Sequence, residues 1–107
     1  MAKRNLPEPE ITYFELTLIR GNTSKKVLLD VESVIGCEDP ECARELLEMC
    51  IGDEELTDLG ELKNLEIVAL SHGKAFVYNF SRDRVLLVLH RRDVDVWAVI
   101  RSVGGLK

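Results

Sequence analysis

The chain has 107 residues, of which 46% are hydrophobic, 31% charged and only 6% aromatic, and its net charge is −5. This length suits one domain, and the apolar content excludes intrinsic disorder, collagen-like repeats and disulfide scaffolds. The acidic balance argues against a dedicated nucleic-acid binder, because such proteins are usually basic. We therefore predict one α+β domain over residues 11–107, preceded by an extended tail at residues 1–10 that contains two prolines.

The charge is unevenly distributed along the chain. Residues 38–66 contain eleven acidic and two basic residues, whereas residues 72–107 contain three acidic and seven basic ones. This asymmetry fits a charged partner, two unlike surfaces that meet in a dimer, or an acidic region that is simply solvated.

Segments that would direct the chain to a membrane or out of the cell are not seen in the sequence. The N-terminus has basic residues but lacks the apolar stretch of a secretory signal. The longest apolar runs, such as residues 85–89, are far shorter than the roughly 20 residues of a membrane helix. The chain also has no glutamine and only four asparagines, a bias typical of thermophiles. We expect a cytoplasmic protein from a thermophilic source.

A hairpin is predicted at the start of the domain. Residues 11–19 are rich in β-branched and aromatic side chains without a clean helical stripe, which is typical of a strand. Residues 20–24 contain Gly, Asn and Ser, which favour a turn. Residues 25–33 are predicted to resume as the second strand.

A helix is predicted next, because Asp39 can cap it and Pro40 suits its first position. Gly52 is expected to end it, and residues 53–62 form a short helical turn or a loop. The apolar residues of the helix that begins at Pro40 fall on one stripe along its surface: Ala43, Leu46, Leu47, Cys50 and Ile51.

Three strands and a closing helix complete the domain. The strands are predicted at residues 65–70, 75–80 and 85–90, and the last of these is apolar enough to be buried on both faces. The helix is capped by Asp93 or Asp95 and ended by Gly104 and Gly105. Because short turns join antiparallel neighbours, we predict an α+β fold: a five-stranded antiparallel sheet with helices packed on it. The predicted order is strand, strand, helix, strand, strand, strand, helix.

The three cysteines lie close together in the sequence. Their spacing matches no zinc or iron–sulfur pattern, so no metal site is predicted. Cys42 and Cys50 are too far apart on one helix to be bridged. Cys37 precedes that helix and could reach Cys42, so both a disulfide and free thiols stay open. A small thiol or metal protein that uses Cys37 and Cys42 is one alternative function.

No catalytic constellation or cofactor motif is recognised. His72 is expected in a turn and His90 at the end of a strand. Neither is expected to be catalytic, because no nucleophile is paired with either histidine in the sequence. No phosphate-binding glycine loop is present. We therefore predict a protein without catalytic residues or a cofactor.

Basic residues near the C-terminus suggest a second alternative, a nucleic-acid or phospholigand binder. Their two pairs flank one predicted strand and would lie roughly 20 Å apart by strand rise. The candidate anion contacts are Arg82, Arg84, Arg91 and Arg92.

The stretch from residue 62 to residue 103 is similar to the second half of roadblock-type domains, those of the dynein light chain roadblock kind. The resemblance lies in an apolar strand that ends at a glycine turn, two further strands and an acid-capped helix. The two strands before the first helix look more like the related longin arrangement. The segments concerned are residues 65–74, 75–80, 84–89 and 93–101.

This resemblance to the roadblock/longin superfamily implies a non-enzymatic homodimer or heterodimer, of which the homodimer is expected here, that scaffolds or regulates a small Ras-like GTPase. In roadblock dimers the middle helix and the strand after it form the dimer face. Carried onto this chain, that face would consist of Leu46, Leu47 and Cys50 from the helix and Ile67 and Ala69 from the strand.

Overall fold

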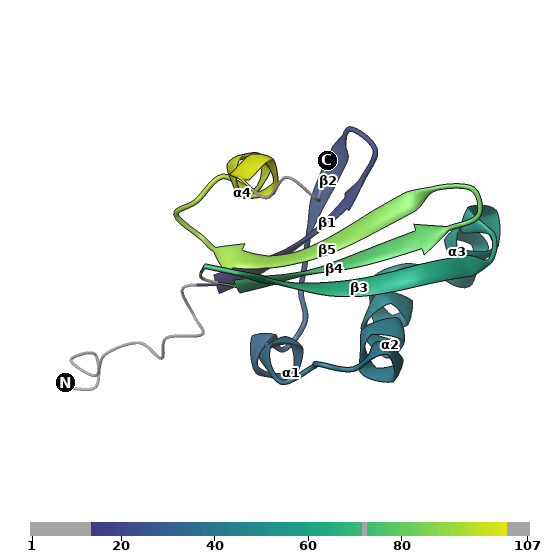
Figure 1. The fold of residues 1–107 in the computed structure, drawn as a ribbon, viewed down its shortest axis with the longest axis horizontal. Coiled ribbons are helices and arrows are strands. Elements are labelled where there is room, and N and C mark those ends of the chain that lie inside the picture. Colours follow the sequence, from purple (N-terminus) through teal and green to yellow (C-terminus); the bar gives the residue numbers. More distant parts are fainter. Residues whose placement is uncertain (1–13, 72, 103–107) are drawn as a thin grey trace.

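The computed structural model describes residues 14–71 and 73–102, which form one five-stranded antiparallel sheet with four helices around it (Figure 1). The strand order across the sheet is β2-β1-β5-β4-β3. The strands are β1 (Phe14–Arg20), β2 (Thr23–Val27), β3 (Leu62–Leu70), β4 (Gly73–Phe80) and β5 (Arg84–Arg91). The helices are α1 (Val31–Ile35), α2 (Pro40–Cys50), α3 (Asp53–Leu59) and α4 (Val96–Ser102).

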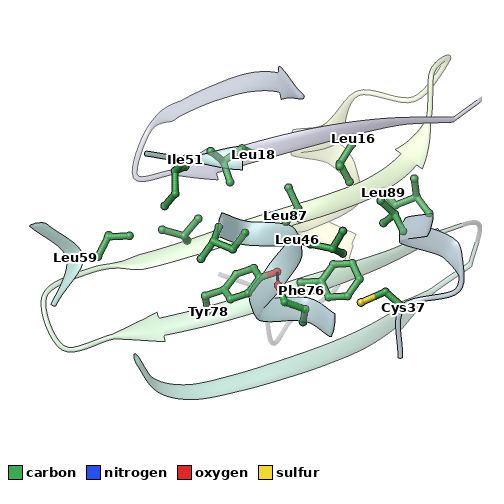
Figure 2. Close-up of a cluster of buried hydrophobic side chains, with 14 residues drawn as sticks. Leu16, Leu18, Cys37, Leu46, Ile51, Leu59, Phe76, Tyr78, Leu87 and Leu89 are labelled. Atoms are coloured by element: carbon green, nitrogen blue, oxygen red, sulfur yellow. Dashed lines mark hydrogen bonds between the residues drawn. The ribbon is translucent and has the colours of Figure 1, made fainter. Parts of the chain in front are cut away.

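The helices divide between the two faces of the sheet. Helices α1 and α2 cover one face, and α4 lies on the opposite face (Figure 1). The larger hydrophobic cluster packs under α1, α2 and α3, with Phe76 and Tyr78 at its centre (Figure 2). We call this the α2-side core. The smaller cluster, the α4-side core, joins the sheet to Val96 and Ile100 of α4.

The predicted fold class is confirmed, since the molecule is an α+β protein with a five-stranded antiparallel sheet. The expectation for the central strand is also confirmed, because every residue from Val85 to His90 is buried. Side chains of a strand alternate between faces, so β5 contributes Leu87 to the α2-side core and Val88 to the α4-side core.

The prediction of a strand over residues 25–33 is wrong. Strand β2 ends at Val27, and α1 begins at Val31. The reason is local: the side chain of Asp30 accepts a hydrogen bond from the backbone N–H of Glu32, which caps the helix. Val34 is then fully buried in the α2-side core, which strand geometry at this position would not provide.

The remaining boundaries differ modestly from those predicted. The segment after α2 forms a third helix, α3, and β3 begins three residues before the expected position, with an irregularity between Leu62 and Asn64. Helix α4 begins after Asp95, whose backbone carbonyl accepts hydrogen bonds from its first turn. The predicted tail at residues 1–10 and the predicted helix end at Gly104 and Gly105 lie outside the described residues.

Arg20 fastens α3 to one end of the sheet. Its guanidinium donates to the carboxylate of Asp83 at 2.7 Å and to that of Glu55 at 3.1 Å, and Asp58 lies 3.7 Å away. The hydrogen bond from Arg20 lowers the pKa of Asp83, and the backbone N–H of Arg84 adds to this effect.

This pairing predicts how stability depends on pH. Because the folded-state pKa of Asp83 is lowered, its contribution is present above the ordinary carboxyl pKa and is lost as pH falls through the folded-state value. We expect Asp83→Asn to reduce the unfolding free energy by about 1 kcal/mol or less at pH 7, since the pair is partly exposed. The difference from wild type should vanish near pH 2, as measured by urea unfolding.

The matched control is Asp58→Asn, which removes a more distant carboxylate from the same arginine. This variant should keep most of the acid-side dependence of the wild type. An Asp83→Asn protein whose stability falls with acid as steeply as that of the wild type would contradict the assignment.

Candidate functional site

The two edges of the sheet are unlike one another. Strand β2, at one edge, has five residues and presents Lys25 and Lys26, and lysines on an edge discourage pairing with another chain. Strand β3, at the other edge, has nine residues, and no described strand pairs with its outer side. After Lys63 it contains no further basic residue and no proline. The outer side of β3, here called the β3 edge, is therefore open for pairing.

The residues of β3 fall into two rows. Leu65, Ile67 and Ala69 lie opposite β4 residues of the α2 side, and Leu65 and Ile67 pack partly against that core. Val68 and Leu70 face the other way and pack against the α4-side core. The β3 edge thus exposes apolar side chains on both faces of the sheet.

Two of the five predicted interface residues are core residues. Leu46 and Leu47 of α2 are 3% and 2% exposed and pack in the α2-side core, because the one apolar stripe of α2 faces its own sheet. Figure 2 shows Leu46 in that core. Cys50, at the end of α2, is only partly buried. The strand residues fit the prediction better, since Ile67 is partly exposed and Ala69 is exposed.

Helix α2 is held against the sheet close to this edge. The buried hydroxyl of Tyr78 in β4 donates a 2.7 Å hydrogen bond to the carbonyl of Ala43. Burial raises the pKa of Tyr78, so the phenol stays protonated and remains a donor. Burial likewise raises the pKa of the Cys50 thiol to about 11, so it is an unreactive neutral thiol at pH 7.

The four candidate arginines do not converge. Arg82 and Arg84 lie at the start of β5, and Arg91 and Arg92 lie at its far end. The guanidinium of Arg91 is engaged by both carboxylate oxygens of Asp93, at 3.1 and 2.7 Å. A single anion-binding patch is therefore not formed by these side chains.

His90 lies inside the protein and is not an exposed strand-end residue. It is 3% exposed, and its Nε2 lies 2.9 Å from the hydroxyl of Thr17. Its Nδ1 lies 2.9 Å from the carbonyl of Arg91. Since a carbonyl can only accept, Nδ1 donates to that of Arg91, and in the neutral imidazole Nε2 then accepts from the hydroxyl of Thr17. Sequence reasoning missed this pair, although a threonine within an apolar strand was a signal for it.

His90 also lines two cavities, of about 410 and 420 Å³, on the α4 side of the sheet. The first lies between β3 and α4, and the second reaches toward β2 and contains both Lys26 and Glu15. Both ring nitrogens of His90 are engaged within the protein, by the hydroxyl of Thr17 and by the carbonyl of Arg91. His72, the other histidine, lies outside the described residues.

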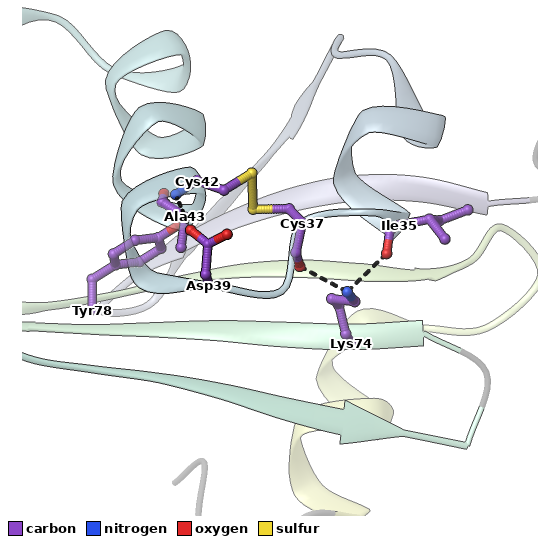
Figure 3. The surroundings of a disulfide bond; sticks show 7 residues. All are labelled: Ile35, Cys37, Asp39, Cys42, Ala43, Lys74 and Tyr78. Atoms are coloured by element: carbon purple, nitrogen blue, oxygen red, sulfur yellow. Dashed lines mark hydrogen bonds between the residues drawn. A yellow bond between two sulfur atoms is a disulfide. The ribbon is translucent and has the colours of Figure 1, made fainter.

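Cys37 and Cys42 form a disulfide that joins the end of α1 to the first turn of α2 (Figure 3). The pairing left open by the sequence is therefore made. Among residues 14–71 and 73–102, no group of three metal-ligating side chains is gathered at one place.

Comparison with known proteins adds no identity to these features. No protein-family model matches the chain, and neither the curated proteins nor the solved structures contain a significant match. The roadblock/longin resemblance therefore stays a prediction. Within the described residues, no helix is long and apolar enough to cross a membrane. The described residues form an α+β fold in which no described strand covers the outer side of β3.

Proposed function

We propose that this chain is a non-enzymatic interaction module that forms a homodimer by pairing its β3 edge with that of a second copy. The observation that supports this most directly is the contrast between the lysine-bearing edge at β2 and the long apolar edge at β3. The roadblock/longin resemblance points to the same strand. Dimers with a two-fold axis, in which the same surface of both subunits forms the interface, are the commonest soluble homo-oligomers.

The sequence of β3 favours one pairing register. Residues directly opposite one another in an antiparallel pair have side chains on the same face of the sheet. The two-fold axis must therefore lie where one residue faces its own copy, and not where two successive residues of β3 face each other's copies. The regular part of β3, beyond the irregularity, runs from Asn64 to Leu70, and its midpoint is Ile67. An axis at Ile67 pairs all seven residues, whereas an axis at Glu66 would pair five of them and place Glu66 opposite its own copy, which is destabilising.

The register centred on Ile67 also matches side chains across the interface. On the α2 side Leu65 faces Ala69 of the second copy, Ile67 faces itself, and the two cores join through one apolar row. On the α4 side Glu66 faces Val68 and Asn64 faces Leu70. Glu66 already accepts a hydrogen bond from Asn64 of its own strand, at 3.3 Å, which offsets the cost of placing its carboxylate beside an apolar neighbour.

The test of this proposal is the mass of the protein in solution, followed by cysteine trapping. Light scattering at about 100 μM should give twice the chain mass. In a Cys50→Ser background, Ile67→Cys should then form a covalent dimer on mild oxidation, because directly opposed residues lie within disulfide reach. Glu66→Cys is the matched control and should trap poorly, since its own copy lies diagonally about 7–8 Å away.

The two measurements fail in different ways. A monomer at 100 μM would refute the homodimer. A dimer in which Glu66→Cys traps faster than Ile67→Cys would refute the register and leave the dimer intact.

We further propose a small Ras-like GTPase as the protein that this dimer binds. The resemblance to the roadblock/longin superfamily is what supports this partner. Titration calorimetry of the dimer with small GTPases of the source organism, loaded with GDP or a non-hydrolysable GTP analogue, should give saturable binding to at least one nucleotide state. Absence of binding in both states would reject the GTPase as partner without affecting the dimer.

A further inference from the structure

The disulfide between Cys37 and Cys42 is local, since the two residues are five positions apart and their Cα atoms are separated by 5.7 Å. It spans the connection from α1 to α2 (Figure 3). Closing so short a loop removes less chain entropy from the unfolded state than closing a long one. The position is therefore not one that would stabilise the fold most.

The two sulfur-bearing residues differ in accessibility. Cys37 is 1% exposed and belongs to the α2-side core, close to Phe76 (Figure 2). Cys42 is partly exposed and is the third residue of α2. The first turn of a helix favours a thiolate over a thiol. One sulfur can therefore meet a reagent from solution, and the other is sheltered behind it.

The backbone around the disulfide is held by contacts that do not involve sulfur. The ammonium of Lys74 in β4 donates to the carbonyls of Ile35 at 2.9 Å and Cys37 at 2.8 Å (Figure 3). The carboxylate of Asp39 accepts from the backbone N–H of Cys42 at 2.8 Å. Both cysteines would therefore stay in place after the S–S bond opens, ready to close it again.

From these three features we infer that Cys37 and Cys42 are a redox-active pair that exchanges reversibly with dithiols in the folded protein. One thiolate of the dithiol attacks Sγ of Cys42, the S–S bond breaks, and Sγ of Cys37 leaves with the electron pair and takes a proton. The second thiol of the reagent then attacks the reagent sulfur that is bonded to Cys42, and Sγ of Cys42 leaves with the electron pair and takes a proton. The reagent departs oxidised, and the protein gains two electrons and two protons.

Dithiothreitol is the probe for this exchange. Added to the native protein at pH 8, it should raise the number of alkylatable thiols per chain by two within minutes, with unchanged circular dichroism. Removing it and adding its oxidised form should restore the disulfide without mixed products. Thiols that appear only after unfolding in urea, or a pair that never forms in the oxidised buffer, would overturn the inference.

Single-cysteine variants test which sulfur is attacked. With glutathione disulfide, Cys37→Ala, which leaves Cys42, should form the mixed disulfide at least about tenfold faster than Cys42→Ala, because reactivity follows exposure and thiolate character. Equal rates would contradict the assigned order of attack. Lys74→Gln should slow reclosure of the reduced pair severalfold, whereas Lys63→Gln, on exposed β3, should not change it.

Discussion

Ala69→Lys is expected to raise the dissociation constant of the proposed homodimer by roughly 100-fold or more. Ala69 is exposed in the single chain, so the longer side chain has room there. Its cross-strand neighbour within the monomer is Lys74, so circular dichroism and urea unfolding of the monomer must accompany the measurement to separate this like-charge pair from the effect on pairing. In the register centred on Ile67 it places two ammonium groups opposite Leu65 side chains, one for each copy. A polar group buried without a partner costs about 1–3 kcal/mol, and two such costs of about 1.4 kcal/mol give the expected factor. Sedimentation equilibrium over a range of concentrations measures it.

The control places the same charge on the opposite edge of the sheet. Ser24 is exposed in β2, beside Lys25 and Lys26, and Ser24→Lys should leave the dissociation constant within about twofold. Equal weakening by both variants would indicate a general charge effect and would remove the β3 edge as the site of pairing.

Phe76→Ala is expected to cost about 3–5 kcal/mol of unfolding free energy, the range for removing a buried aromatic ring. Phe76 is fully buried at the centre of the α2-side core, and its ring also lies 5.8 Å from the ammonium of Lys74. Since a small domain has about 5–15 kcal/mol in total, this variant should be marginally folded. Urea unfolding at a protein concentration well below the dissociation constant of the proposed homodimer gives the value.

Leu28→Ala is the matched control, because Leu28 is 98% exposed although it is a large hydrophobic residue. Its unfolding free energy should stay within about 0.5 kcal/mol of wild type. A Phe76→Ala protein that lost less than 1 kcal/mol would show that the cluster is not the stabilising core of this domain.

Predictions from the sequence succeeded where the determinant is local. Asp39 and Pro40 predicted the start of α2 correctly, since the side chain of Asp39 caps that helix in the structure. The helix over residues 31–35 was missed because its local propensity and its cap favour different structures. Val27, Val31 and Val34 are β-branched and favour a strand on propensity, but the cap at Asp30 and the burial of Val34 outweigh that weak preference.

Residues whose role depends on distant parts of the chain could not be placed in the same way. The apolar stripe of α2 was visible, but whether it faced the sheet or a partner was not, and Leu46 and Leu47 face the sheet. Thr17 and His90 are 73 positions apart and meet only because β1 and β5 are neighbours.

The sequence by itself determined the class of fold, because turn residues, caps and the alternation of apolar side chains act over a few positions. It also determined that the strand over residues 85–90 would be buried on both faces. Only the tertiary structure decided the strand order β2-β1-β5-β4-β3, and with it that β3 lies at an open edge. It likewise brought Lys74 to the carbonyl of Cys37. Such contacts depend on which strands lie side by side, a choice made by the burial of the whole core rather than by any single segment.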